Sequence, residues 1–91
     1  PEFVRNLVFR SPVTRNRFEG LNENEISTLE TMIEKNTPMT FEDLSGYLGV
    51  SRVAAAGYIQ TLADREIVTQ LDSPGKKKFF RITDVFKDAL V

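Results

Sequence analysis

The sequence predicts a mainly α fold with one small β-hairpin: an α+β domain of three helices, two short strands and a C-terminal helix. Three observations predict it. Two segments join a capping pattern to apolar residues at helical spacing, and a third helical segment opens at a serine shortly after a glycine. A lysine-rich turn then separates two runs of strand-forming residues. The 91 residues are enough for one small domain.

The first helix is expected at residues 23–35. Asn22 and Glu25 have the spacing of a capping box, in which each side chain accepts a hydrogen bond from the other residue's backbone N–H. Pro38 ends the helix, because the residue before a proline avoids helical backbone angles. The residues that recur at helical spacing are Ile26, Leu29, Met32 and Ile33.

The second helix is expected at about residues 41–47. Thr40 and Asp43 repeat the capping pattern at its start. Gly49, which follows it, can take the positive φ of a tight turn between helices. The apolar stripe of this helix consists of Phe41, Leu44 and Leu48.

The third helix is expected at residues 51–65, with Ser51 as its N-cap. The short helix, the turn at Gly49 and this longer helix have the spacing of a helix-turn-helix. One face of the third helix is expected to pack into the core through Ala55, Ile59 and Leu62.

A β-hairpin is expected next, with strands at residues 67–71 and 77–82. The turn at 72–75 contains a proline that presets φ and a glycine that supplies a positive φ. Either Phe79 or Phe80 should point inward, because side chains alternate along a strand. A short C-terminal helix capped by Thr83 should follow, with the apolar residues Val85, Phe86 and Leu90.

Charge is unevenly distributed along the chain, although the net charge is only −1. Residues 1–18 carry +3, residues 19–66 carry −6 and residues 67–91 carry +2. Local charge governs contact with a polyanion more than the total does. The two basic ends favour such contact, and the acidic middle counts against it.

The N-terminal residues are expected to form an arm, 1–21, in front of a domain at 22–91. Residues 1–3, Pro-Glu-Phe, have the composition of a cloning junction and are set aside. Residues 4–18 mix apolar side chains with arginines, a pattern that favours packing against a partner. Arg5, Arg10, Arg15 and Arg17 of the arm are also able to follow DNA.

The composition argues against several classes of function. With neither Cys nor His, the chain lacks thiolate metal ligands, a thiol nucleophile and the commonest general base. The glycines are scattered and form no phosphate-binding loop. No apolar run is long enough to span a membrane. We therefore expect a non-enzymatic chain without metal or cofactor, located in the cytoplasm or associated with the nucleoid.

Two segments resemble a known group of proteins. Residues 48–68, LGVSRVAAAGYIQTLADREIV, align without gaps with the recognition-helix frame of winged helix-turn-helix proteins. Residues 79–90, FFRITDVFKDAL, are similar to the strand that leads into the last helix of that fold. The resemblance covers about residues 21–90 and is strongest to MarR-like and Lrp-like transcription regulators.

The resemblance implies a DNA-binding domain, either a small regulator or the DNA-reading module of a longer protein. The helix at 51–65 would enter the major groove, and the hairpin at 67–82 would be the wing that holds phosphates. The residues that would face DNA are Ser51, Arg52, Val53, Ala56, Gly57 and Gln60 on the helix, with Lys76, Lys77, Lys78 and Arg81 on the hairpin.

The recognition face departs from what such regulators usually carry. Arg52 is its clear cation, and with Gln60 it has the chemistry for bidentate base contacts. The small side chains around them permit close approach of a backbone or contact with thymine methyl groups. They fit a protein surface equally well. Gly57 also suggests close approach, because glycine inside a helix costs about 1 kcal/mol relative to alanine.

Two hypotheses about partners follow. In the first, the partner is double-stranded DNA, bound by a homodimer that forms through residues 4–18 or the C-terminal helix. In the second, the domain docks a protein subunit or peptide through its apolar recognition face. RNA is a weaker third choice, because the sequence has no base-stacking motif.

Overall fold

Three helices form the larger part of the fold, and the first two begin at the predicted caps. The computed structural model describes residues 18–72, 75 and 77–88. In α3 (Glu23–Lys35), the side chains of Asn22 and Glu25 each accept from the other's backbone N–H, at 2.8 and 2.9 Å. α4 (Phe41–Leu48) starts with the same reciprocal pair, made by Thr40 and Asp43. Both predicted capping boxes are therefore confirmed.

A tight turn joins α4 to α5 (Arg52–Asp64). Gly49 has φ +67°, in the left-handed region that favours glycine, and caps the C-terminus of α4. The Oγ of Ser51 accepts from the backbone N–H of Ala54 at 3.1 Å and starts α5. The predicted helix-turn-helix is confirmed, with α4 one residue longer than expected.

The core lies between the three helices and the sheet. α5 packs against both α3 and α4. The predicted inward residues of α5 are buried, as are Leu44 of α4 and three of the four predicted residues of α3, while Ile33 is partly buried. The buried apolar side chains are Ile26, Leu29, Met32, Met39, Leu44, Ala55, Ile59, Leu62, Ile67, Val68, Phe80, Ile82 and Phe86.

The wing is a two-stranded antiparallel sheet of β1 (Val68–Leu71) and β2 (Phe79–Ile82). Phe80 is the phenylalanine that points inward. β2 begins two residues later than predicted, because β1 ends at Leu71, opposite Phe79. In the turn, Gly75 has the expected positive φ of +119°.

The segment before α4 is joined to the wing by an isolated bridge that the sequence did not predict. The backbone N–H groups of Met39 and Phe80 donate to each other's carbonyls at 2.9 and 2.8 Å. The ring of Phe41 then stacks on that of Phe80, with centroids 4.9 Å apart. These contacts hold the start of α4 against the hairpin.

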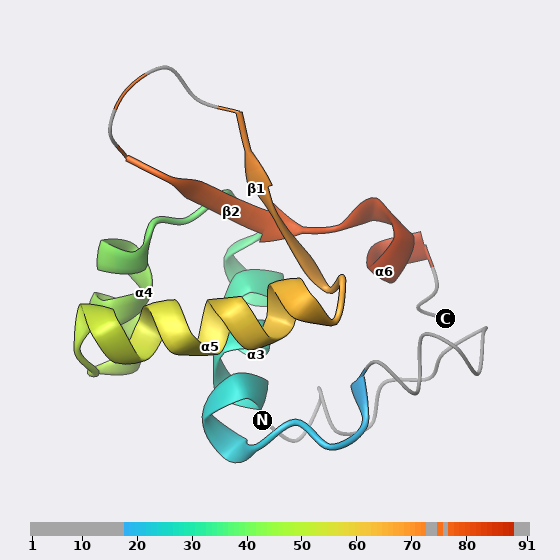
Figure 1. The fold of residues 1–91 in the computed structure, drawn as a ribbon, viewed down its shortest axis with the longest axis horizontal. Coiled ribbons are helices and arrows are strands. Elements are labelled where there is room, and N and C mark those ends of the chain that lie inside the picture. Colours follow the sequence, from blue (N-terminus) through green and yellow to red (C-terminus); the bar gives the residue numbers. More distant parts are fainter. Residues whose placement is uncertain (1–17, 73–74, 76, 89–91) are drawn as a thin grey trace.

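The wing is followed by α6 (Asp84–Asp88), at the opposite end of the molecule from α4 (Figure 1). Thr83 caps this helix by accepting from the N–H of Phe86 at 3.3 Å. Phe86 is buried, whereas Val85 is 63 % exposed because so short a helix turns one side to the core. Leu90 lies outside the described residues.

Of the predicted N-terminal arm, the structure describes residues 18–21. Phe18 and Leu21 pack against the core, and the guanidinium of Arg65 donates to the carbonyl of Glu19. This end of the arm is therefore attached to the domain. The remainder, including the segment expected to pair two copies, lies outside the described residues. No helix in the described part of the chain is long and apolar enough to cross a membrane.

Candidate nucleic-acid interface

The N-terminus of α5 is suited to an anionic partner. α3 and α4 each carry acidic residues in the first turn, whereas α5 carries none there and has Arg52 instead. The partial positive charge of the helix dipole and unpaired backbone N–H groups at such an end favour anions. The first turn of α5 therefore adds a full positive charge to a partial one.

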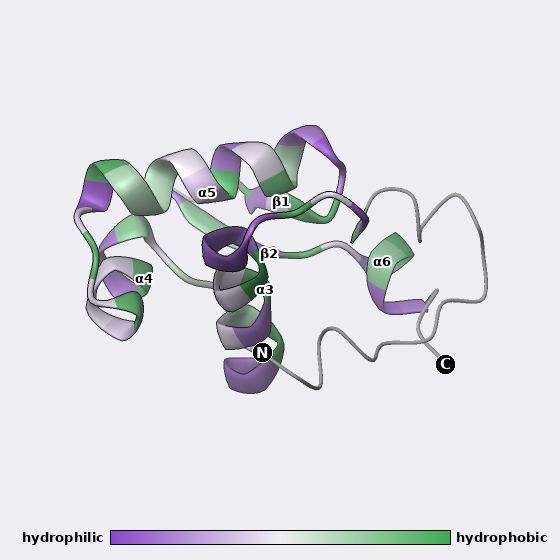
Figure 2. Cartoon of the chain, turned by 90° about the horizontal axis from the view of Figure 1, so that it is seen from below, coloured by the Kyte–Doolittle hydropathy of each residue, from purple (hydrophilic) through white to green (hydrophobic). Residues whose placement is uncertain are grey.

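The exposed face of α5 has few charges over its first two turns. In Figure 2, green and pale colours follow the purple start of the helix over these turns. Val53 is 84 % exposed and Ala56 is half-buried. Gly57 and Gln60 continue the same face, opposite the buried Ala55 and its neighbours. Four of the residues expected to face DNA thus share one face of α5, which we call the α5 ridge (Val53, Ala56, Gly57 and Gln60).

Gly57 lies in the open on this ridge. A Cβ atom added to it would meet nothing within 4 Å, so neither the wing nor another described helix requires a glycine at this position. The explanations for Gly57 that invoke packing inside the described chain are therefore excluded. Packing within the described residues thus gives no reason for its cost in the helix.

Gln60 is engaged within its own helix. Its Nε2 donates to Oδ1 of Asp64 at 2.9 Å, one turn further along. Bidentate readout of adenine uses both the carbonyl and the amide of such a side chain. Gln60 must therefore turn away from Asp64 to read a base in this way.

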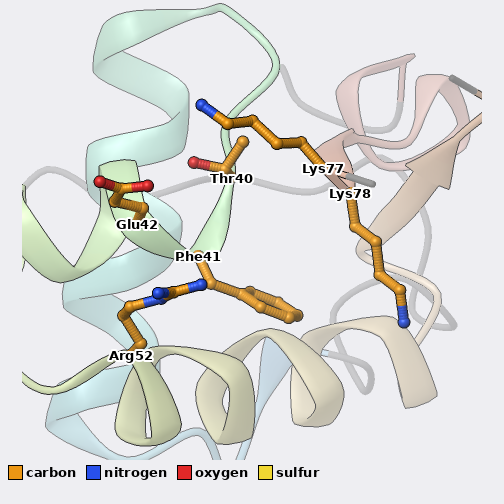
Figure 3. A pocket seen from close by; sticks show the side chains of 6 residues that line it. All are labelled: Thr40, Phe41, Glu42, Arg52, Lys77 and Lys78. Carbon is orange, nitrogen blue, oxygen red and sulfur yellow. The ribbon is translucent and has the colours of Figure 1, made fainter. Parts of the chain in front are cut away.

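A depression of about 270 Å³ brings Arg52 together with two wing lysines. Figure 3 shows Arg52 rising from the start of α5 toward Phe41 and Glu42, while Lys77 and Lys78 extend from the hairpin. Thr40 of the α4 cap completes the lining. We call this depression the basic notch (Thr40, Phe41, Glu42, Arg52, Lys77 and Lys78).

The charge balance of the basic notch favours an anion. Its three cations face a single carboxylate, that of Glu42. Within residues 18–72, 75 and 77–88, none of the three cations has an ion-pair partner. A phosphate group carries the negative charge that these cations lack and accepts hydrogen bonds from guanidinium and ammonium groups. No group of three carboxylates in the described chain is placed to hold a metal ion.

Arg81, a hairpin residue expected to face DNA, is not among the residues of the notch. Arg81 Nη1 lies 3.0 Å from Oδ1 of Asp84 and also donates to the carbonyl of Ile82. Arg81 instead lines a separate small hollow, together with Pro38 and other residues. Asp84, three residues further along the chain, is thus the acidic partner of Arg81. Lys76 lies outside the described residues.

Sequence reasoning missed Thr40, Phe41 and Glu42 as residues of the site. The sequence assigned Thr40 to a cap and Phe41 to the core, and these assignments are correct. These residues also lie beside the wing lysines, because the Met39–Phe80 bridge holds the start of α4 against the wing. That bridge joins residues 41 positions apart and has no local sequence signal.

Comparison with known proteins finds structural similarity alone. No family model and no curated protein sequence matches the chain. The ST1889 protein of the archaeon Sulfolobus tokodaii is similar with a TM-score of 0.69 and 18% identity, over 84% of this chain and 74% of that one. Several other similar structures are of transcription regulators.

NMB1585, a MarR family regulator from Neisseria meningitidis, has a TM-score of 0.66 and 18% identity, over 76% of this chain and 49% of its own. Mb0332 of Mycobacterium bovis, a possible ArsR-family regulator solved as a homodimeric winged helix-turn-helix DNA-binding domain, has a TM-score of 0.62 and 16% identity, over 77% and 60%. The chain thus spans about half to three-quarters of these structures. At such identities the similarity shows the fold, and the chain has the winged helix-turn-helix fold found in MarR-family and ArsR-family regulators.

Proposed function

We propose that the chain is the DNA-binding domain of a transcription regulator, with α5 in the major groove and the wing on the phosphates. The observation that carries this proposal is that Arg52, Lys77 and Lys78 line one notch beside the start of α5. Since it acts on chromosomal DNA, the domain would work in the cytoplasm or nucleoid.

The dimensions of B-DNA agree with this arrangement. The major groove is about 12 Å wide and admits an α-helix, whose N-terminal residues contact the base edges in helix-turn-helix proteins. The residues at this end of α5, the N-cap Ser51 with Arg52 and Val53, are all exposed. The notch then lies beside the groove, where a phosphate of the flanking strand would meet its cations.

We assign Arg52 to a phosphate and not to a base. Its side chain extends toward the start of α4 and shares the notch with both described lysines (Figure 3). The ridge residues are then left to face the bases. Arg81, paired with Asp84, would add little to DNA affinity.

A salt titration tests the proposal. Binding of a labelled duplex is measured by fluorescence anisotropy at several salt concentrations, starting at low salt. The logarithm of the affinity should fall linearly with the logarithm of salt concentration, with a slope of about −0.9 per phosphate contact. A Lys77→Ala/Lys78→Ala variant should bind more weakly and show a shallower slope.

The matched control removes two lysines elsewhere. Lys35 stacks on Tyr47 and Lys87 donates to Asn36, both outside the notch. A Lys35→Ala/Lys87→Ala variant changes the net charge equally and should retain the salt slope of the original chain. Equal slopes for the two double variants, or no duplex binding at low salt, would contradict the proposal.

We further propose that the domain acts as a homodimer, paired through the α6 end. The Mb0332 domain, a structural neighbour, is homodimeric. On this chain, Val85 lies with Ala63, Val68 and Thr69 around a shallow hollow of about 350 Å³. Because α6 and α4 lie at opposite ends of the molecule, pairing there leaves the notch open (Figure 1). Residues 4–18 are the alternative dimerisation segment.

Docking of a protein is the second candidate function. It is favoured by the exposure of Val53 and of Tyr47, the latter at 57 %. Binding to a protein partner would depend on these apolar side chains and respond weakly to salt. Loss of partner capture in a Val53→Asp variant, with no duplex binding by the original chain, would favour this candidate.

A further inference from the structure

The chemistry of the α5 ridge indicates what kind of base pair it contacts, provided that the proposed DNA-binding function holds. Direct readout uses hydrogen bonds to base edges or apolar contact with the thymine methyl group. The groups that the ridge presents to a groove therefore define the bases that it can distinguish.

Hydrogen-bonding groups are scarce on the part of the ridge nearest the helix start. Arg52 extends into the basic notch. Gln60 is bonded to Asp64, and an exposed carboxylate at that position would repel the phosphates. Close contact is therefore favoured for the first two turns of α5, before Gln60.

Those two turns present methyl groups and open space. Val53 is 84 % exposed and carries two methyl groups, and Ala56 follows on the same face. Gly57 lacks a side chain, and the space where a Cβ would stand is empty. Val53 and Gly57 are separated by about 6 Å along the helix axis, a distance of about two base steps.

We propose that α5 reads thymine methyl groups on one or two neighbouring base pairs, with Val53 as the residue that determines this specificity. Gly57 lets the helix approach closely enough for Val53 to make apolar contact. Sequence preference then depends on apolar contact more than on bidentate hydrogen bonds.

Deoxyuridine substitution isolates the methyl group, since it removes the C5 methyl of thymine and leaves the hydrogen-bonding groups of the base intact. A duplex is first enriched from a random pool with the original chain. Each thymine in it is then replaced in turn by deoxyuridine, and affinity is measured by anisotropy. One or two positions should lose about fourfold in affinity, as expected for burial of one methyl group.

Two variants complete the experiment. Val53→Ala should bind the thymine and deoxyuridine duplexes equally at one of the sensitive positions. Ile33→Val, which removes one methyl group from a residue of α3 outside the notch and the ridge, should discriminate as the original chain does. Thermal melting checks that both variants are folded.

The outcomes separate this inference from the proposed function. If the original chain binds duplexes but is insensitive to deoxyuridine at every position, or if Val53→Ala discriminates unchanged, methyl readout is wrong and DNA binding stands. If no duplex binds at low salt, the proposed function fails and the inference fails with it.

Discussion

Gly57 shows how a single residue connects stability with binding. It lies inside α5, where glycine destabilises a helix, yet nothing in the described chain occupies the space beside it. In the proposed complex, the DNA duplex occupies this space. A side chain at this position should then stabilise the free protein and weaken its binding to DNA.

We predict that Gly57→Ala raises the free energy of unfolding by about 0.5–1 kcal/mol, because alanine has the higher helix propensity. The same variant should bind duplex DNA several-fold more weakly, since its Cβ keeps the helix away from the groove. Chemical denaturation and anisotropy measure the two effects.

Gly46 is the matched control for this variant. It is an exposed glycine inside α4 with open space beside it, and it does not line the notch. Gly46→Ala should stabilise the chain similarly and leave its affinity for DNA unchanged. Tight binding by Gly57→Ala would show that the ridge at this point does not approach its partner.

At the scale of elements, the position of the wing relative to α4 depends on a small number of contacts. The Met39–Phe80 bridge fixes the backbones, and the Phe41–Phe80 stack fixes the side chains above the core. Because Lys77 and Lys78 lie directly before β2, these contacts also place the lysines beside Arg52.

A double-mutant cycle measures this coupling. We predict that Phe41→Leu and Phe80→Leu are not additive and that their interaction free energy is about 0.5–1.5 kcal/mol, the value of an aromatic pair beyond its buried area. Unfolding of the two single variants and the double variant in urea provides the data. Additivity within about 0.5 kcal/mol would show that the rings act independently.

The elements themselves could be predicted from the sequence because their signals are local. The capping boxes at Asn22 and Thr40 and the glycine turn at Gly49 involve residues close together in the chain, and all were confirmed. The contact between the start of α4 and the wing joins residues distant in sequence, and no local pattern encodes it. The Arg81–Asp84 pair was also not predicted, although its residues are only three positions apart, at the end of β2 and the start of α6.

At the scale of the whole molecule, the two proposed binding surfaces lie at opposite ends of the fold. The basic notch lies where α4, α5 and the wing meet, and the exposed Val85 lies at the end formed by α6 (Figure 1). A regulator that reads two half-sites needs one end for DNA and another for its second copy. The two functions should therefore respond to different substitutions.

We predict that Val85→Asp weakens the homodimer, because it removes an exposed apolar side chain from the interface and places a second carboxylate in the hollow that Glu66 already lines. Sedimentation velocity over a range of concentrations should show a larger monomer fraction. Val53→Asp, the same change at the other end, should dimerise normally. If the Val85→Asp variant dimerises as the original chain does, the interface lies in another part of the chain, and residues 4–18 are the next candidate.

The most direct test of the central claim is an amide NMR titration of the chain with a duplex at low salt. If DNA binds at the basic notch and the α5 ridge, the resonances of residues 40–42, 51–57 and 77–78 should shift together. Those of α6 and of Lys35 should stay in place as long as the oligomeric state does not change. Shifts confined to α6 or to the C-terminal end of α3, or no shifts at all, would contradict DNA binding at the basic notch and the α5 ridge.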